Sequence, residues 1–297
     1  MYIWEVLKKT FKEFVEDTPL NYSSTIAFYV IFSLPAILMI VVSIGGSAYE
    51  DQVVRENLLT QIQNLFGTES STAVEKVLEN ASASGSGFLT KVVGFIALGF
   101  SATTVFISLQ DGINRIWNIK SKPEKDWVNF LKNRLLSLAM VVSIGFLLLV
   151  SLGVDTFLAV FKEFIESNFS ELTFFVVSGI NLLFSFLVIT LVFALIFKIL
   201  PDAVVQWKDV WIGAVFTTLL FVTGKFLMGL YLGSSALGSV YGAAGSLVLL
   251  LLWVYFSAII ALLGAQFTFV FARERGRHIT PKKHAVFIEQ VEQERED

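Results

Sequence analysis

Long apolar runs free of charged residues follow one another along the chain and predict membrane-spanning helices. A helix needs about 20 mostly apolar residues to cross the hydrocarbon core of a bilayer. The last run is far too long for one crossing, and the Gly- and Ser-rich stretch 232–246 divides it. The pattern therefore predicts an all-α, polytopic membrane protein whose membrane domain, residues 21–272, has six transmembrane helices at about 21–47, 88–110, 136–158, 172–200, 210–233 and 244–272.

The segments outside the spans carry a helical periodicity of their own. In the predicted outer loop, residues 48–87, apolar side chains recur every three or four positions, which predicts short amphipathic helices. Residues 1–20 place an apolar face opposite Lys8, Lys9 and Lys12, so we expect a cytoplasmic amphipathic helix there. Such a helix either lies in the inner membrane interface or packs on the bundle, and the periodicity fits both arrangements.

Basic residues gather beside alternate ends of the predicted spans. Most of the 22 Lys and Arg residues lie in the N-terminal segment, in the connections after the second and fourth spans, and in the tail 273–297. Because cytoplasmic loops of membrane proteins carry such an excess, we predict that both termini are cytoplasmic. The tail after Thr280 is Glu-rich and highly charged, and we expect it to be mobile.

Composition removes several classes of function. Hydrophobic residues make up 55% of the chain and charged residues only 16%, against about 25% charged residues in soluble domains. There is no Cys, and both His residues lie in the tail, which excludes thiolate chemistry, iron–sulfur clusters and a buried His metal site in the membrane domain. A net charge of −3 without a long basic run argues against nucleic-acid binding, and no P-loop for direct ATP coupling occurs. We therefore expect no cofactor, no metal and no catalytic residue.

Groups of residues recur in an order that is typical of one family. They are Asp17-Thr-Pro19 with Phe32-Ser33-Leu34-Pro35, then Asn114-Arg-Ile-Trp117, and in the last third Leu200-Pro201, Gly213-Ala214, Gly224-Lys225, Tyr241-Gly242, Trp253-Val-Tyr255 and Leu263-Gly264-Ala265. With them the sequence resembles, over nearly its full length, the YihY/BrkB family of bacterial inner-membrane proteins, once mislabelled as ribonuclease BN. The resemblance implies a six-helix protein of the bacterial inner (cytoplasmic) membrane with a suspected transport role. Many members are expected to carry Glu where this chain has Gln266, so a role that needs negative charge there does not carry over.

Lys225 is the basic residue deepest inside a predicted span. A charged side chain in hydrocarbon is energetically costly, so its position requires an explanation. Counted from the outer ends of their helices, Lys225 and Asn181 lie at similar depth, and Asp155 is within reach of an extended lysine. With Tyr241 and Gln266 they form our predicted transport pathway, in which Lys225 attracts an anionic group in an outward-opening cavity. The alternative is a lysine that snorkels to the outer interface or binds helix carbonyls.

Prolines and glycines mark further positions within the spans. Pro35 and Pro201 are predicted hinges, with a packed kink and a plain helix stop as the respective alternatives. Gly229 and Gly233 form a GxxxG pattern, which favours close helix packing or a thin-walled outer vestibule.

Polar residues from three predicted spans also meet at the cytoplasmic end. They form either an inner polar gate or a solvated rim held by ion pairs. They are Gln110, Asp111, Asn114, Arg115 and Lys198, together with Gln266.

Together these features favour a protein that binds or moves an amphiphilic or anionic solute, or a lipid, without an ATPase of its own. Its expected partners are membrane lipids and that solute, and not nucleic acid. The alternatives are a non-transporting envelope scaffold that acts through the outer helices and the tail and, more remotely, a cytoplasmic-face hydrolase. A water-accessible cavity at Lys225 would separate the transporter from the scaffold.

Overall fold

The structure is a computed structural model, and it describes residues 2–46, 51–66, 68–82, 103–122, 172–234 and 245–288, together with positions 135, 139 and 143. Most of these residues are helical. The helices are α1 (Tyr2–Glu16), α2 (Pro19–Gly46), α3 (Asp51–Phe66), α4 (Thr68–Ser82), an unlabelled helix over residues 103–116, α7 (Leu172–Ile199), α8 (Trp207–Ser234) and α10 (Gly245–Glu274). The strands are β1 (Ile119–Ser121), β2 (Ala203–Val204), β3 (Thr280–Pro281) and β4 (Ala285–Phe287).

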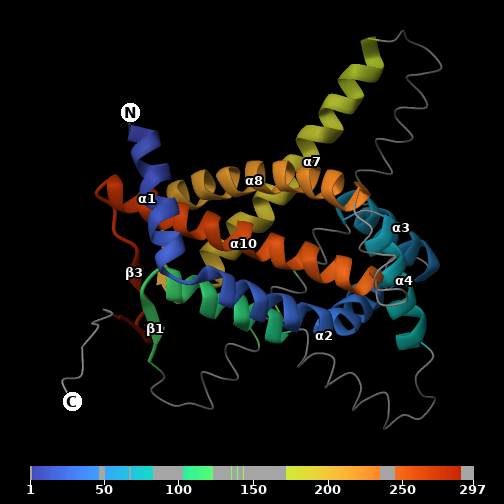
Figure 1. Cartoon of the computed structure of the whole chain (residues 1–297), viewed down its shortest axis with the longest axis horizontal. Helices are drawn as coiled ribbons and strands as arrows, with labels where there is room; N and C mark the ends of the chain where they lie inside the picture. Colours follow the sequence, from blue (N-terminus) through green and yellow to red (C-terminus); the bar gives the residue numbers. More distant parts are fainter. Residues whose placement is uncertain are drawn as a thin grey trace.

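Helix α10 occupies the middle of the described structure. It lies between α8 and α2, which run beside it along the long axis of the molecule, and α7 packs against α8 (Figure 1). Helix α1 crosses one end of this bundle, where β1 and β3 also lie, and it contacts α10 (Figure 1). The α3–α4 pair covers the opposite end (Figure 1). The described parts of the predicted outer loop and the described parts of the two terminal segments therefore lie at opposite ends of the bundle.

Three of the described helices are long and apolar enough to cross a membrane. The qualifying segments are Leu182–Ile199, Trp207–Tyr231 and Leu247–Glu274. Helices α2, α7, α8 and α10 begin and end close to the limits of four predicted spans. Because most of the second predicted span and nearly all of the third lie outside the described residues, the count of six stays a prediction.

Two prolines lie near the ends of helices. Helix α2 begins at Pro19, where the missing N–H removes no hydrogen bond, and it continues through position 35 to Gly46. Helix α7 ends at Ile199, just before the buried Pro201, as expected from the restriction that proline places on the preceding residue. This position fits the helix-stop interpretation of Pro201, and the hinge roles of Pro35 and Pro201 stay predictions.

Helices α8 and α10 approach closely because each offers a glycine to a threonine of the other. A Cβ added at Gly213 would lie 1.9 Å from Thr268 Oγ1, and one added at Gly264 would lie 1.8 Å from Thr217 Oγ1. Both threonine hydroxyls donate within their own helix, Thr217 to Gly213 O at 2.7 Å and Thr268 to Gly264 O at 2.8 Å. By contrast, nothing lies within 4 Å of a Cβ added at Gly229. The close approach therefore uses Gly213 and Gly264 and not Gly229 of the predicted GxxxG pair.

Two short antiparallel ladders bind the tail to the same end of the bundle as α1. Strand β1 pairs with β4, and β2 pairs with β3. Among the described residues of the tail, Ile288 donates its backbone N–H to Asn118 O at 2.8 Å. This order differs from the mobile tail expected after Thr280. Charge content suggested mobility, but Ile279 and Ala285 are buried and the backbone groups are paired with partners distant in sequence.

Candidate functional site

Lys225 lies on the packed face of α8. Phe221 and Met228, four residues before and three after it, share that face, and each is only 8% exposed. Phe226 and Leu227 lie on the outward face and are 65% and 58% exposed. The side chain of Lys225 is half-buried. The lysine therefore leaves the helix toward the inside of the bundle and not toward the surface that the span offers to lipid.

Helix α10 packs closely against α8 on one side of Lys225. The described residues provide no polar partner for the Lys225 side chain. A Cβ added at Gly224 would lie 2.8 Å from Ile260 Cδ1, so α10 approaches α8 immediately beside the lysine. Within the described ranges, no hydrogen bond or ion pair reaches Lys225 Nζ. Asp155 and Tyr241 lie outside those ranges, and of Asn181 only its place in α7 is described. The proposed contacts of Lys225 with Asn181 and Asp155, and the place of Tyr241 in the transport pathway, stay predictions.

A second polar cluster surrounds Asp202, in the connection between α7 and α8. Asp202 is 4% exposed, and Gln110 Nε2 donates to its Oδ1 at 3.1 Å while Asn114 Nδ2 donates to its Oδ2 at 3.0 Å. The Asp202 N–H donates in turn to Asn114 Oδ1 at 2.8 Å, and His284 Nε2 lies 2.9 Å from Asp202 Oδ1. These hydrogen bonds offset the desolvation of the carboxylate.

Three separate segments build the Asp202 cluster. Gln110 and Asn114 lie one turn apart on the helix 103–116, so their amides leave the same face. The α7–α8 connection supplies Asp202, and the tail supplies His284 and the Lys282 N–H, which donates to Asp202 O at 2.9 Å. Sequence reasoning identified Gln110 and Asn114 but missed Asp202 and His284. The available signal was the pair of amides at a span end, which needs a buried acceptor.

Lys198 contacts the α7–α8 connection, and the charge of Arg115 acts on Asp17. Lys198 Nζ donates to Val205 O and lies 5.4 Å from the centre of the Trp207 ring. Burial raises the pKa of Asp17, and the positive charge of Arg115 opposes that shift. Of the predicted rim residues, Gln110 and Asn114 therefore bind the buried Asp202, whereas Lys198 binds the backbone of the α7–α8 connection.

Asp111 lies beside the Asp202 cluster and changes charge near neutral pH. Its pKa is raised to about 6, first because the surrounding protein displaces water from its carboxyl group and second because Asp202 is negatively charged. Asp111 itself keeps an exposed surface. Among the described residues no group of three or more His, Cys, Asp or Glu side chains is arranged to hold a metal ion.

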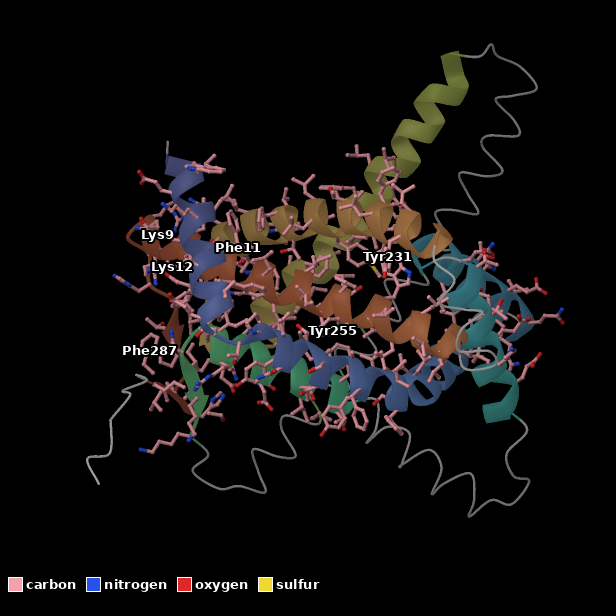
Figure 2. The ribbon with its side chains drawn as sticks, viewed as in Figure 1. Lys9, Phe11, Lys12, Tyr231, Tyr255 and Phe287 are labelled. Carbon is pink, nitrogen blue, oxygen red and sulfur yellow. The ribbon has the colours of Figure 1, made fainter. Side chains whose placement is uncertain are left out.

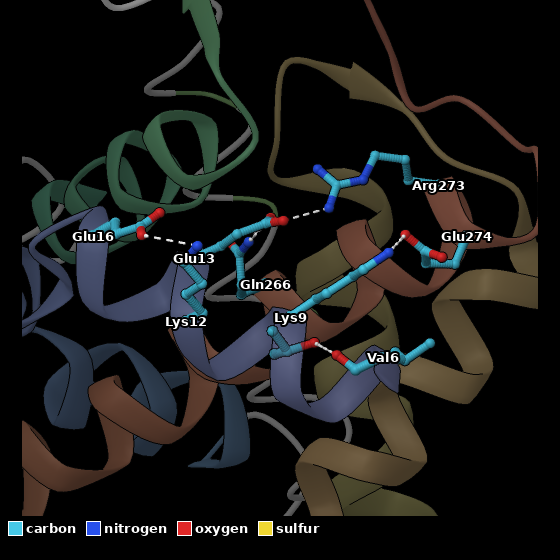
Figure 3. A network of polar contacts seen from close by, with 9 residues as sticks. Val6, Lys9, Lys12, Glu13, Glu16, Gln266, Arg273 and Glu274 are labelled. Carbon is cyan, nitrogen blue, oxygen red and sulfur yellow. Dashed lines mark hydrogen bonds and ion pairs between the residues drawn. The ribbon is translucent and has the colours of Figure 1, made fainter. Parts of the chain in front are cut away.

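Gln266 belongs to a different network, which joins α10 to α1 (Figure 3). It is 1% exposed, and its Nε2 donates to Glu13 Oε2 at 3.0 Å. Arg273 donates to the other oxygen of Glu13, and Lys9 Nζ forms an ion pair of 2.7 Å with Glu274. Gln266 Oε1 is buried and accepts no hydrogen bond from the described residues. The amide therefore joins α10 to α1 at the end of the bundle that carries the tail, and its donor reaches Glu13 and not the Asp202 cluster.

Comparison with known proteins assigns the chain to a family. The family described as virulence factor BrkB matches residues 10–289. The chain belongs to the BrkB family. This BrkB-family protein also has apolar helices long enough to span a bilayer, and together these findings identify it as a membrane protein.

The curated relatives of this BrkB-family protein bear the name UPF0761 membrane protein. The one from Verminephrobacter eiseniae is 30% identical over 192 residues, which is 63% of this chain and 42% of the relative. The one from Stenotrophomonas maltophilia strain K279a is 26% identical over 255 residues, which is 85% of this chain and 57% of the relative. The chain thus spans about half the length of the curated relatives it matches. No solved structure matches it.

Proposed function

We propose that this BrkB-family protein binds or carries an anionic or amphiphilic solute, or a lipid headgroup, in the bacterial inner membrane. In this proposal both termini are cytoplasmic, and the protein has neither an ATPase nor a catalytic site of its own. The observation that supports it most is Lys225, a half-buried cation on the packed face of a membrane-spanning helix.

The energetics of a lysine at this position favour an anionic ligand. A charged side chain inside hydrocarbon is costly, so it faces water, a counter-charge or a ligand. At an effective dielectric constant of about 20, a negative charge 4 Å from the ammonium gains roughly 4 kcal/mol, against roughly 1 kcal/mol in water. A phosphate, carboxylate or sulfate group that reaches Lys225 would therefore be held more strongly than the same group at the protein surface.

The packing of the opposite end supports an opening toward the outer half. Trp117, Phe197 and Leu200 are 0% exposed at the end that carries α1 and the tail. The Trp117 indole N–H donates to Ala265 O at 2.9 Å, so the helix 103–116 is held directly against α10. Large side chains thus fill the described part of the cytoplasmic end, and we propose that access to Lys225 comes from the other side.

Single cysteines test the cavity directly because the native chain contains none. In Lys225→Cys, a small anionic methanethiosulfonate reagent should react, because water in the cavity allows the thiolate to form. Leu227→Cys is the matched control, since its exposed position on the other face of α8 should lie in lipid, where thiolates do not form. Equal resistance of both cysteines would show that residue 225 is packed away from water, and the envelope scaffold would then be the better function.

Ligand binding is the second part of the test. Native mass spectrometry with dioctanoyl phosphatidic acid and dioctanoyl phosphatidylcholine should show that the wild-type protein retains the anionic lipid preferentially. Lys225→Met keeps the length of the side chain and removes its charge, so it should lose the preference at an unchanged melting temperature. An unchanged preference in Lys225→Met would remove Lys225 from the proposed site.

A further inference from the structure

Helix α1 has an exposed apolar face that its packing on the bundle does not use. Val6, Thr10 and Phe14 are buried, and Val6 packs against Phe267, Val270 and Phe271 of α10. Trp4, Phe11 and Val15 share an adjacent side of the helix and are 73%, 65% and 60% exposed. We call Trp4, Phe11 and Val15 the α1 strip. Three large apolar side chains that share one side of a helix and are this exposed indicate an interaction surface.

The orientation of α1 indicates which partner the strip meets. The helix crosses the end of α2, α8 and α10, so it lies in the membrane plane if those helices cross the bilayer (Figure 1). Phe11 lies on the side of α1 that faces along the bundle toward its middle, whereas Lys9 and Lys12 lie on the side toward its end (Figure 2). In that orientation the side of α1 with Phe11 faces the hydrocarbon region, and the side with Lys9 and Lys12 faces away from it.

Two tryptophan residues near α1 indicate that this end of the bundle lies at the membrane interface. Trp207 and Trp211, in the first turns of α8 at this end of the bundle, are 47% and 40% exposed. Trp side chains concentrate at the headgroup level of a bilayer, where their amphipathic rings are stable. Only two residues separate α1 from α2, so α1 cannot move far from this level.

We infer that α1 is an interfacial helix whose strip inserts into the cytoplasmic-side leaflet, at the boundary between headgroups and acyl chains. The insertion depends on apolar burial and not on attraction to anionic lipid, because the three lysines of α1 are balanced by three glutamates. Glu13 is bound by Arg273, Lys9 by Glu274, and Lys12 lies 4.0 Å from Glu16. The same helix fixes Gln266 through Glu13, so the leaflet supports the inner end of α10.

Spin labels on single cysteines measure the depth of the strip in the intact protein. Phe11→Cys and Val15→Cys report on the strip, and Lys12→Cys is the matched control next to Phe11 on the charged side. In nanodiscs of phosphatidylcholine, power saturation should show labels 11 and 15 more accessible to oxygen than to a water-soluble nickel chelate, and label 12 the reverse. The pattern should not change when a third of the lipid is replaced by phosphatidylglycerol.

Three other results would overturn the inference. If label 11 is as accessible to the nickel chelate as label 12, the strip faces water. If labels 11 and 15 are shielded from both reagents, protein covers the strip, and chemical cross-linking then shows whether a second copy of the chain is responsible. If insertion requires phosphatidylglycerol, electrostatic attraction and not apolar burial holds the helix. All three positions are exposed, so the substitutions leave the packed core intact.

Discussion

Replacing Gly264 by alanine tests whether the glycine–threonine contacts hold α8 and α10 together. The new Cβ would lie 1.8 Å from Thr217 Oγ1 and 2.8 Å from both Cβ and Cγ2 of Thr217. Another rotamer of Thr217 moves Oγ1 but leaves its Cβ in place, and it breaks the hydrogen bond to Gly213 O. No rotation of Thr217 therefore removes the overlap, and the two helices must separate locally.

The expected cost follows from three effects. Over-packing of a tight contact costs about 1–3 kcal/mol. Loss of the threonine hydrogen bond adds about 0.5–1.5 kcal/mol. The greater helix propensity of alanine returns about 0.5–1 kcal/mol. We expect Gly264→Ala to be destabilised by about 2–3 kcal/mol, and Gly213→Ala, which meets Thr268 in the same way, by a similar amount.

The chain provides a graded set of controls for this experiment. Gly229→Ala in α8 meets nothing within 4 Å, so it should be neutral or slightly stabilising. Gly224→Ala meets only Ile260 Cδ1, the flexible end of a side chain, so its cost should be intermediate. The double variant Gly264→Ala/Thr217→Gly removes the overlapping side chain and should recover part of the lost stability.

Thermal unfolding of the purified proteins in one detergent, followed by near-ultraviolet circular dichroism, measures the series. The reasoning fails if Gly264→Ala has the same melting temperature as the wild-type protein, or if Gly229→Ala is destabilised as much as Gly264→Ala. It also fails if removing Thr217 does not improve Gly264→Ala, because the overlap would then not be the cause.

Three further predictions concern the polar networks and the topology. Gln266→Glu should lower the melting temperature at pH 7.5, because it places a second carboxylate about 3 Å from Glu13, and the loss should shrink at pH 5 or when Glu13→Gln is added. Asp111→Asn should raise the melting temperature at pH 7.5 and change it little at pH 4. The pKa of Asp111 is raised from 3.8 to about 6, so the folded state binds the proton more tightly and loses stability as pH rises through that window. A wild-type melting temperature for Asp111→Asn at both pH values would contradict this. In intact, right-side-out cells, Ser84→Cys should react with an impermeant maleimide and Lys283→Cys should not; the opposite result would mean that the orientation predicted from basic residues is inverted.

The positions of helices along the chain could be predicted from the sequence because the energy that sets them is local. Moving a charge into hydrocarbon is costly wherever the rest of the protein lies, so uncharged runs alone placed segments close to α2, α7, α8 and α10. The same argument singled out Lys225 as a charge within a predicted span, and helical periodicity predicted α1, α3 and α4.

Contacts between helices required the tertiary structure, because a sequence gives depth along a helix but neither its rotation nor its neighbour. Gln110 and Asn114 were recognised as polar residues at a span end, but their acceptor, Asp202, is about 90 residues away in the chain. The sequence grouped Gln266 with the other polar residues at span ends, and only packing showed that its amide donates to Glu13 of α1.

The glycine contacts and the amphipathic helix α1 also depended on the tertiary structure. GxxxG suggested close packing at Gly229, whereas the close approach uses Gly213 and Gly264, because each meets a threonine that the other helix supplies. Periodicity allowed α1 either to lie in the interface or to pack on the bundle. The structure shows that one part of its apolar face packs on α10 while the α1 strip stays exposed. A single neighbouring helix covers only part of the circumference of α1, so the periodicity alone could not tell which apolar residues are buried.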